Sequence, residues 1–376
     1  MTLASSSSDD VILFDEIATA GGQSFGVATL NVPAALNALS LRMVELLTPQ
    51  LQQWAADANI AGVILQASGE KAFCAGGDIR GLYDTIREHG SAPNPYAQNF
   101  FATEYVLDHL IHNYPKPFLC WGHGIVMGGG VGLLAGASHR VVTPTSRIAM
   151  PEINIGLYPD VGGSWFLRRM PGRVGLFLAL TAAPLNAADT LFCGLADVCI
   201  DQARKAEVLQ AISNTSWSTD AQANRATLSR LLDGFVVSAL PASLVREHFD
   251  SVNQLMAGEE LAVIDQRLRS LQSDVPWLTT AATTYTKGSP TSAAISFALW
   301  QRVPRMSLAE VFRVEYNVSL ACCAHPDFPE GTRALLVDKD RNPRWQPATL
   351  AEVTPAIIED HFIDRFEGTH PLADLT

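Results

Sequence analysis

The stretch GVILQASGEKAFCAGGDIR, residues 62–80, contains the structural unit that the first half of the chain repeats. Residues 62–67 are apolar apart from one glutamine, which is typical of a buried strand. The loop that follows ends in two glycines, and Asp78 is placed to cap a helix. The same order returns at residues 118–137, as a strand, a glycine-rich turn and a short apolar helix. Strands that alternate with helices across glycine turns predict an α/β fold of repeated units.

The pattern changes beyond about residue 205. Before it, apolar spacing predicts further elements of both kinds: strands at 26–31, 140–143 and 147–150, and helices at 40–58 (capped by Ser40), 78–88 and 96–113. After it, the helical stretches are 221–233, 240–256, 258–272 and 291–300. We therefore expect a flexible N-terminus (1–10), an α/β core (11–205) and a mainly helical C-terminal region (206–376).

Composition restricts the class of protein. The 376 residues are 48% hydrophobic and carry a net charge of −12, which fits a large folded core and argues against a nucleic-acid partner. No apolar run is long enough to cross a membrane, and the first ten residues resemble neither a signal peptide nor a transit peptide, so a cytoplasmic location is expected. The six cysteines form no Cys-x-x-Cys pair and have no zinc-like histidine spacing, so we expect buried thiols and no metal site.

Two glycine loops are candidates for binding negative charge. CAGGD (74–78) and MGGGVG (127–132) each follow an expected strand and open an expected helix. Free backbone N–H groups and the helix dipole favour an anion at such a position, and two converging donors would form an oxyanion hole. Each glycine loop by itself is also explained by a tight turn and close packing.

Other catalytic signatures are absent or fail on context. Gly130, Gly132 and Ala135 fit a G-x-G-x-x-A dinucleotide fingerprint, but the acid it requires, Glu152, comes one strand too late. The sequence has no G-x-S-x-G elbow and no G-K-[ST] phosphate loop. His123, near the second glycine loop, is expected to be a packed structural histidine.

Two carboxylates remain, in MPEINIGLYPDVGG (150–163). Glu152 and Asp160 each follow a proline, which restricts the backbone, and no lysine or arginine lies between them. In an apolar pocket such acids have a raised pKa and can act as base, acid or nucleophile. The alternatives are a helix cap for Asp160 and a surface acid for Glu152, and spacing alone does not choose between these interpretations.

Three motifs together resemble the crotonase (enoyl-CoA hydratase/isomerase) superfamily: AFCAGGDIR (72–80), HGIVMGGGVGL (123–133) and MPEINIGLYPDVGGSWFL (150–167). The resemblance implies a spiral core of repeated ββα units. It also implies that two glycine loops bind the thioester carbonyl of an acyl-CoA. By motif position, the oxyanion-hole donors are the N–H groups of Gly77 and Gly129, with Ala75 and Asp78 beside the substrate.

One departure points to a branch of that superfamily. Gly132 stands where hydratases carry their first catalytic glutamate, whereas Glu152 matches the second, and Asp160 stands where hydratases usually have glycine. This combination looks like the 3-hydroxyisobutyryl-CoA hydrolase branch, which takes part in valine breakdown. The segments SPTS (289–292), EVFRVEYNVSLACC (310–323) and EGTRALLVDKDRNPRWQP (330–347) are similar to the C-terminal extension of that branch.

The resemblance, which runs from about residue 11 to residue 362, implies roles for individual residues. Glu152 would attack the thioester or act as general base on water, while Asp160 would bind the 3-hydroxyl group or orient the water. Glu104 matches a substrate-contacting glutamate of the branch. No metal or cofactor is implied beyond the CoA of the substrate.

The sequence leaves other properties of the protein open. A homo-oligomer is compatible with the resemblance, and a eukaryotic relative would work in the mitochondrial matrix. Lys71, Arg80 and Lys116 are available for CoA phosphates. Two other functions stay open: a different crotonase reaction, such as isomerisation or hydration of an enoyl-CoA, and non-catalytic acyl-CoA binding.

Overall fold

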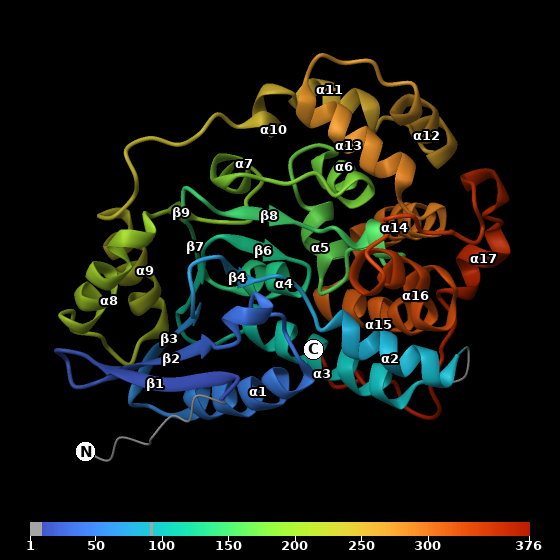
Figure 1. The fold of residues 1–376 in the computed structure, drawn as a ribbon. Coiled ribbons are helices and arrows are strands. Elements are labelled where there is room, and N and C mark those ends of the chain that lie inside the picture. The colour runs from blue at the N-terminus through green and yellow to red at the C-terminus, as the bar shows by residue number, and fades with distance from the viewer. Residues whose placement is uncertain (1–9, 91–92) are drawn as a thin grey trace. The chain divides into compact units, whose positions relative to one another are not determined.

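The computed structural model describes residues 10–90 and 93–376 (Figure 1). The chain divides into two compact units. The N-terminal residues 1–9, most of the segment expected to be flexible, lie outside the described part. Each unit is assembled from three stretches of chain. Unit 1 consists of Met1–Gly77, Leu110–Ile148 and Asn186–Ala242, and unit 2 of Asp78–His109, Ala149–Leu185 and Ser243–Thr376. The units thus divide the chain differently from the boundary at residue 205 that the pattern of strands and helices suggested.

A six-stranded sheet forms the centre of unit 1. Its order is β1-β2-β3-β5-β7-β9; β1 and β2 are antiparallel and the other neighbours are parallel. The strands are β1 (Ile12–Ala18), β2 (Ser24–Leu30), β3 (Ile60–Ala67), β5 (Phe118–Gly122), β7 (His139–Val142) and β9 (Val198–Cys199). The parallel order with helical connections is the α/β architecture that the sequence predicts.

A second, three-stranded sheet carries the glycine loops. Its order is β4-β6-β8, and its strands are β4 (Ala72–Cys74), β6 (Ile125–Met127) and β8 (Arg147–Ala149). Strands β4 and β6 pair in parallel, so their carboxyl ends lie at the same edge. Strands β4 and β6 were not predicted, because three residues are too few for a periodic pattern to develop.

Helices cover the sheet of unit 1. They are α1 (Leu41–Ala56), α4 (Gly129–Gly136), α7 (Ala187–Phe192), α8 (Lys205–Ser213) and α9 (Ala221–Asp233). Apolar side chains of α8 and α9, among them Ile212 and Leu228, pack with Phe25, Ile64 and Trp121 of the strands in one buried core. As expected, Ser40 caps α1: its hydroxyl accepts from the N–H of Met43 at 3.3 Å, and the helix continues through Pro49.

Unit 2 is made almost entirely of helices. They are α2 (Ile79–His89), most of α3 (Pro95–His112), the 3₁₀ turn η2 (Glu152–Ile155), α5 (Gly163–Arg168), α6 (Val174–Thr181), α10 (Leu244–Glu247), α11 (Phe249–Leu255), α12 (Leu261–Arg269), α13 (Pro276–Lys287), α14 (Pro290–Arg302), α15 (Leu308–Ala324), α16 (Asp327–Thr332) and α17 (Pro355–Asp360). None of the helices in the described ranges combines the length and apolar character needed to span a bilayer.

One helix expectation in unit 2 is wrong. The single helix expected at 240–256 is two helices, α10 and α11, which meet at His248 with a non-helical backbone. Pro241 lies outside both, and the Ser243 hydroxyl accepts from the N–H of Arg246 at 3.1 Å, so the first of them begins only at Leu244. Apolar spacing continues across the break and therefore hides it.

Candidate active site

Glu152 begins a short turn at the end of strand β8. Pro151 precedes η2, and the Glu152 side chain is only 4% exposed. Its Oε2 atom is buried without a hydrogen-bond partner. Glu152 is therefore no surface acid, and one of its oxygens remains unpaired for a ligand or a proton.

Asp160 lies in the same unit, in the loop before α5. The Tyr105 hydroxyl donates to its Oδ2 at 2.7 Å, and the side chain is buried. The residue that caps α5 is Gly162, which has no side chain to contribute. The helix-cap interpretation of Asp160 is thus wrong, and its carboxyl group is instead hydrogen-bonded to the Tyr105 hydroxyl.

Helix α3 brings two more acids into unit 2. Glu104 and Asp108 are one helical turn apart on the same face, and both are buried. Neither oxygen of Asp108 has a hydrogen-bond partner, and Oε1 of Glu104 has none. Burying a polar group without a partner costs free energy, so these positions indicate a role that folding alone does not explain.

Helix α15 supplies a fifth buried acid, Glu315. Its two carboxyl oxygens accept from the N–H groups of Gly162 at 2.7 Å and Ser164 at 3.0 Å. These bonds fix the backbone directly after Asp160. Neither Asp108 nor Glu315 was among the site residues predicted from the sequence. Both lie in helical stretches that contain other polar residues, FFATEYVLDHLI in one case and EVFRVEYNVSLACC in the other, so the sequence carried no signal that set them apart.

All five acids have a raised pKa. Burial is the largest cause for each, and for Glu152 the charge of Asp160 adds to it, so the pKa of Glu152 lies well above its usual range. The pKa values of Glu104 and Asp108 are also raised well above normal, by burial and then by neighbouring carboxyls. Burial raises the pKa of Asp160 to about 6, opposed by the hydrogen bond from Tyr105, and raises that of Glu315 to about 8.

The glycine loops lie side by side within unit 1. A side chain on Gly130 would come within 2.5 Å of the Cys74 carbonyl oxygen, so only glycine allows this approach. Gly129 is the first residue of α4, and Gly77 bridges to Leu39. The two expected N–H donors thus belong to loops that follow neighbouring parallel strands.

Two residues expected beside the substrate have structural partners. The Ala75 N–H donates to the Leu36 carbonyl at 3.1 Å. At the start of unit 2, the Asp78 carboxylate caps α2 by accepting from the N–H of Gly81 at 3.2 Å. The Ala75 N–H and the Asp78 carboxylate are therefore already hydrogen-bonded within the protein. For Ala75 this leaves van der Waals contact with the substrate as the expected role.

The expectations for His123 and for the cysteines are confirmed, whereas Lys116 is not free to bind CoA phosphates. His123 is buried and its Nε2 lies 2.9 Å from the Gly69 carbonyl, and all six cysteines are buried and free. Lys116 donates to two carbonyls at the end of α1, those of Trp54 and Asp57, so it is committed to structure. In the described ranges, no group of three or more His, Cys, Asp or Glu side chains could hold a metal ion.

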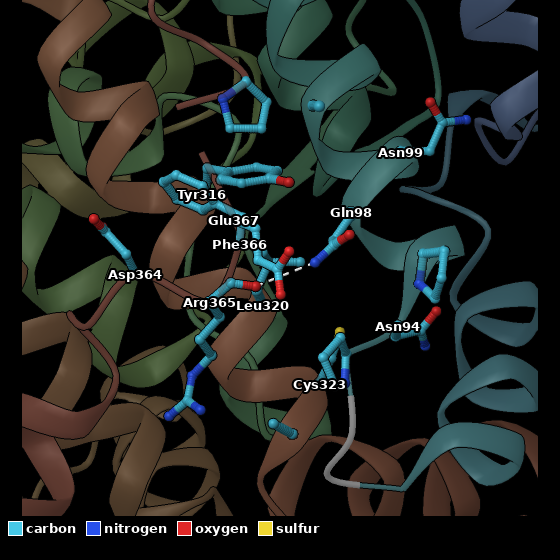
Figure 2. Close-up of a pocket in the computed structure, with 15 residues that line it drawn as sticks. Asn94, Gln98, Asn99, Tyr316, Leu320, Cys323, Asp364, Arg365, Phe366 and Glu367 are labelled. Atoms are coloured by element: carbon cyan, nitrogen blue, oxygen red, sulfur yellow. Dashed lines mark hydrogen bonds between the residues drawn. The ribbon is translucent and has the colours of Figure 1, made fainter. Parts of the chain in front are cut away.

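One hollow within unit 2 is lined by none of the five acids. It measures about 850 Å³ and lies between the start of α3, one face of α15 and the C-terminal tail (Figure 2). Tyr316, Leu320 and Cys323 line it, and Gln98 donates to the Arg365 carbonyl at its wall. A second hollow, of about 410 Å³ in unit 1, is lined by Lys71 and the loops on either side.

Comparison with known proteins assigns the chain to a family. Residues 25–362 match the family described as enoyl-CoA hydratase/isomerase. The chain belongs to this family. A curated relative from Danio rerio, named 3-hydroxyisobutyryl-CoA hydrolase, mitochondrial, is 40% identical over 368 residues, which cover 96% of this chain and 91% of the relative. The Homo sapiens protein of the same name is 38% identical over 343 residues, covering 90% of this chain and 86% of the relative.

Solved structures agree on the fold but carry other names. A carnitinyl-CoA dehydratase from Mycobacterium thermoresistibile superposes with a TM-score of 0.84 at 35% identity, covering 95% of this chain and 97% of that one. An enoyl-CoA hydratase from Rhodobacter sphaeroides 2.4.1 gives 0.82 at 33% identity, covering 94% and 97%. The crotonase-type α/β fold expected from the sequence is thereby confirmed.

Proposed function

We propose that this protein hydrolyses the thioester of 3-hydroxyisobutyryl-CoA to 3-hydroxyisobutyrate and CoA, a step of valine breakdown. The observation that carries the proposal is the buried acid cluster of unit 2, in which Glu152 and Glu104 each keep an unpaired carboxyl oxygen. Relatives that share most of their length with this chain bear the name of that hydrolase. A buried carboxyl with a raised pKa is suited to acid, base or nucleophilic work at neutral pH.

In the proposed reaction the glycine loops stabilise negative charge. The N–H groups of Gly77 and Gly129 would polarise the thioester carbonyl and then stabilise the oxyanion of the tetrahedral intermediate. Such donors contribute most when they are fixed in advance, and the close packing of the two loops in unit 1 fixes their backbones. Collapse of the intermediate then releases CoA as a thiol once it has received a proton.

Glu152 has two chemically distinct ways to open the thioester. As a nucleophile it forms a mixed anhydride, which water then hydrolyses. As a general base it takes a proton from the water that attacks the carbonyl carbon. A single turnover in ¹⁸O-labelled water separates them, because only the anhydride route, when water attacks the Glu152 carbonyl, leaves label in the Glu152 carboxyl group.

Asp160 and Glu104 are proposed to recognise the 3-hydroxyl group. A site that hydrogen-bonds a substrate hydroxyl strongly rejects an analogue without it, because the buried polar groups are then left unpaired. The unpaired Oε1 of Glu104 is such a group before substrate binds. Ala75 and Asp78 are proposed to contact the rest of the acyl-CoA.

The remaining expectations about partners extend this proposal. Water and carboxyl groups suffice for hydrolysis, so the reaction is proposed to need no metal or cofactor other than the CoA of its substrate. Lys71 and the hollow beside it are proposed to contact CoA. A cytoplasmic location, a homo-oligomer, and the absence of nucleic-acid or membrane partners stay predictions. The curated relatives carry the word mitochondrial in their names, which favours the matrix for a eukaryotic protein.

A second candidate function is hydration or dehydration of an enoyl-CoA, which the names of the two solved structures suggest. The position after the triple glycine speaks against it, since Gly132 in α4 offers no carboxyl group there.

A thiol-release assay with matched esters decides between the two functions. The purified protein is given 3-hydroxyisobutyryl-CoA, isobutyryl-CoA and methacrylyl-CoA, and free thiol and loss of the double bond are followed separately. We expect thiol release from the hydroxy ester and, in Glu152→Gln, a fall of about 10²-fold or more. Glu104→Gln should narrow the preference for the hydroxy ester over isobutyryl-CoA. Hydration without thiol release would refute the proposal.

A further inference from the structure

Three buried hydroxyl groups connect Asp160 to helix α15. The Tyr105 hydroxyl lies 2.7 Å from Oδ2 of Asp160 and 2.7 Å from the Ser319 Oγ. Ser319 lies 2.9 Å from the Tyr158 hydroxyl, which donates to the Glu315 carbonyl at 2.7 Å. All three hydroxyl-bearing side chains are 0% exposed, so bulk water supplies no further partner. The result is one chain of four oxygen–oxygen contacts with fixed ends.

The number of hydrogens in this chain depends on Asp160. If Asp160 is a carboxylate, Tyr105, Ser319 and Tyr158 provide three hydrogens for four contacts. Tyr105 then donates to Asp160 and Tyr158 to the carbonyl, so one of the two contacts of Ser319 has no hydrogen. If Asp160 carries a proton on Oδ2, four hydrogens serve four contacts and every oxygen in the chain is satisfied.

The surroundings of Asp160 add to the preference for a neutral acid. Carboxyl groups face it from three elements: Glu152 on η2, Glu104 and Asp108 on α3, and Glu315 on α15. The other titratable groups that interact with it are the phenols Tyr105 and Tyr158 and the thiols Cys322 and Cys323. All of these are neutral or negative when they titrate, so none of them stabilises a carboxylate by its charge.

We propose that Tyr105, Ser319 and Tyr158 form an oriented hydrogen-bond relay that holds Asp160 in place and stabilises both of its protonation states. The Ser319 hydroxyl is the central group of this relay. In the neutral state Asp160 donates to Tyr105, Tyr105 to Ser319, and Ser319 to Tyr158. When Asp160 gives up its proton, Tyr105 turns its hydrogen toward the new carboxylate. These are positioning residues, and their importance for turnover rests on the role of Asp160 in the proposed function.

The relay predicts opposite effects for two neighbouring hydroxyl deletions. Tyr105→Phe removes the phenol that donates to the carboxylate, a charge-assisted bond, so Asp160 should titrate about one pH unit higher. Ser319→Ala leaves the bond from Tyr105 to the carboxylate intact but deprives Tyr105 of an acceptor in the neutral state. Asp160 should therefore titrate about one unit lower in Ser319→Ala.

Infrared titration of the folded protein tests this without using activity. The C=O band of protonated Asp160 is identified by its loss in Asp160→Asn and followed from pH 4 to pH 9 in each variant. Two matched controls keep the hydroxyl relay intact: Tyr316→Phe, a buried tyrosine of α15 that lines the hollow of Figure 2, and Ser296→Ala, a buried serine on α14. Both controls should titrate as the unaltered protein does, and thermal unfolding verifies that every variant is folded.

The outcomes separate this inference from the proposed function. Opposite shifts in Tyr105→Phe and Ser319→Ala support the relay, and the acid limb of the kcat/KM profile should move in the same two directions. Shifts of equal sign, no shift, or the absence of a titrating Asp160 band would overturn it. If thiol release fails but the infrared shifts appear, the relay stands and only the proposed reaction falls.

Discussion

Replacing Asp160 by asparagine should make the protein more stable at pH 8 than the unaltered chain. Burial raises the pKa of Asp160 from 3.8 to about 6, so the folded state binds this proton more tightly than the unfolded state does. The contribution of this proton to stability is therefore fully present below the pKa of the unfolded state and is lost as the pH rises through the pKa of the folded state. A difference of about two pKa units corresponds to about 3 kcal/mol, lost between about pH 4 and pH 6. Asparagine stays neutral throughout and avoids this loss.

Thermal unfolding at pH 4.5, 6 and 8 measures the effect. At pH 4.5 Asp160 is protonated and asparagine can replace it as donor to Tyr105, so the two melting temperatures should be close. At pH 8 the variant should melt a few degrees higher while its thiol-release activity is greatly reduced. Asp84→Asn, at an exposed acid of α2, is the control and should show no such divergence. A difference in melting temperature that does not change with pH would refute the reasoning.

Two further predictions concern the packing around the site. Gly130→Ala should destabilise the protein by several kcal/mol or prevent folding, because the new Cβ would lie 2.5 Å from the Cys74 carbonyl oxygen. The control is Gly234→Ala, where the atom nearest to the new Cβ is at 3.3 Å, and the urea midpoints of the two variants are compared. Glu315→Gln should lower the free energy of unfolding by about 1–3 kcal/mol at pH 6, because the amide group of glutamine cannot accept from a second backbone N–H. At this pH the raised pKa of about 8 keeps Glu315 neutral, so that glutamate and glutamine are compared without a difference in charge. Urea unfolding at pH 6 measures the change, and an unchanged midpoint would contradict the role given to Glu315.

The sequence was sufficient for the architecture of the core because its signals are local. The strand at 62–67 and the cap at Ser40 rest on residues adjacent in the chain, and the structure places β3 and α1 there. The two-unit division could not be predicted in this way. It depends on packing between stretches far apart in sequence, such as 78–109 with 243–376, and no periodicity reports such contacts.

The same distinction applies to the candidate site. Proline and glycine around Glu152 and Asp160 make these acids conspicuous in sequence, whereas Asp108 and Glu315 look like ordinary polar positions of helices. Only the fold shows that Asp108 is buried without a partner and that Glu315 binds the backbone after Asp160. Glu315 and the backbone that it binds are about 150 residues apart in the sequence, and Asp108 lies one helical turn from Glu104. No single sequence motif could contain these contacts.

The acid cluster also favours release of the product of the proposed reaction. The thioester that enters is uncharged at its acyl end, whereas hydrolysis creates a carboxylate at the carbon that Glu152 addresses. The charged groups that act on Glu152, Glu104 and Asp108 are other carboxyls, so no cation compensates the product's charge, and each acid of the cluster that has lost its proton repels it. In a buried site this repulsion is large compared with the same pair in water. The cluster thus tolerates the neutral substrate, which it can bind through its hydroxyl group, and disfavours the anionic product, so that release and not reversal follows hydrolysis.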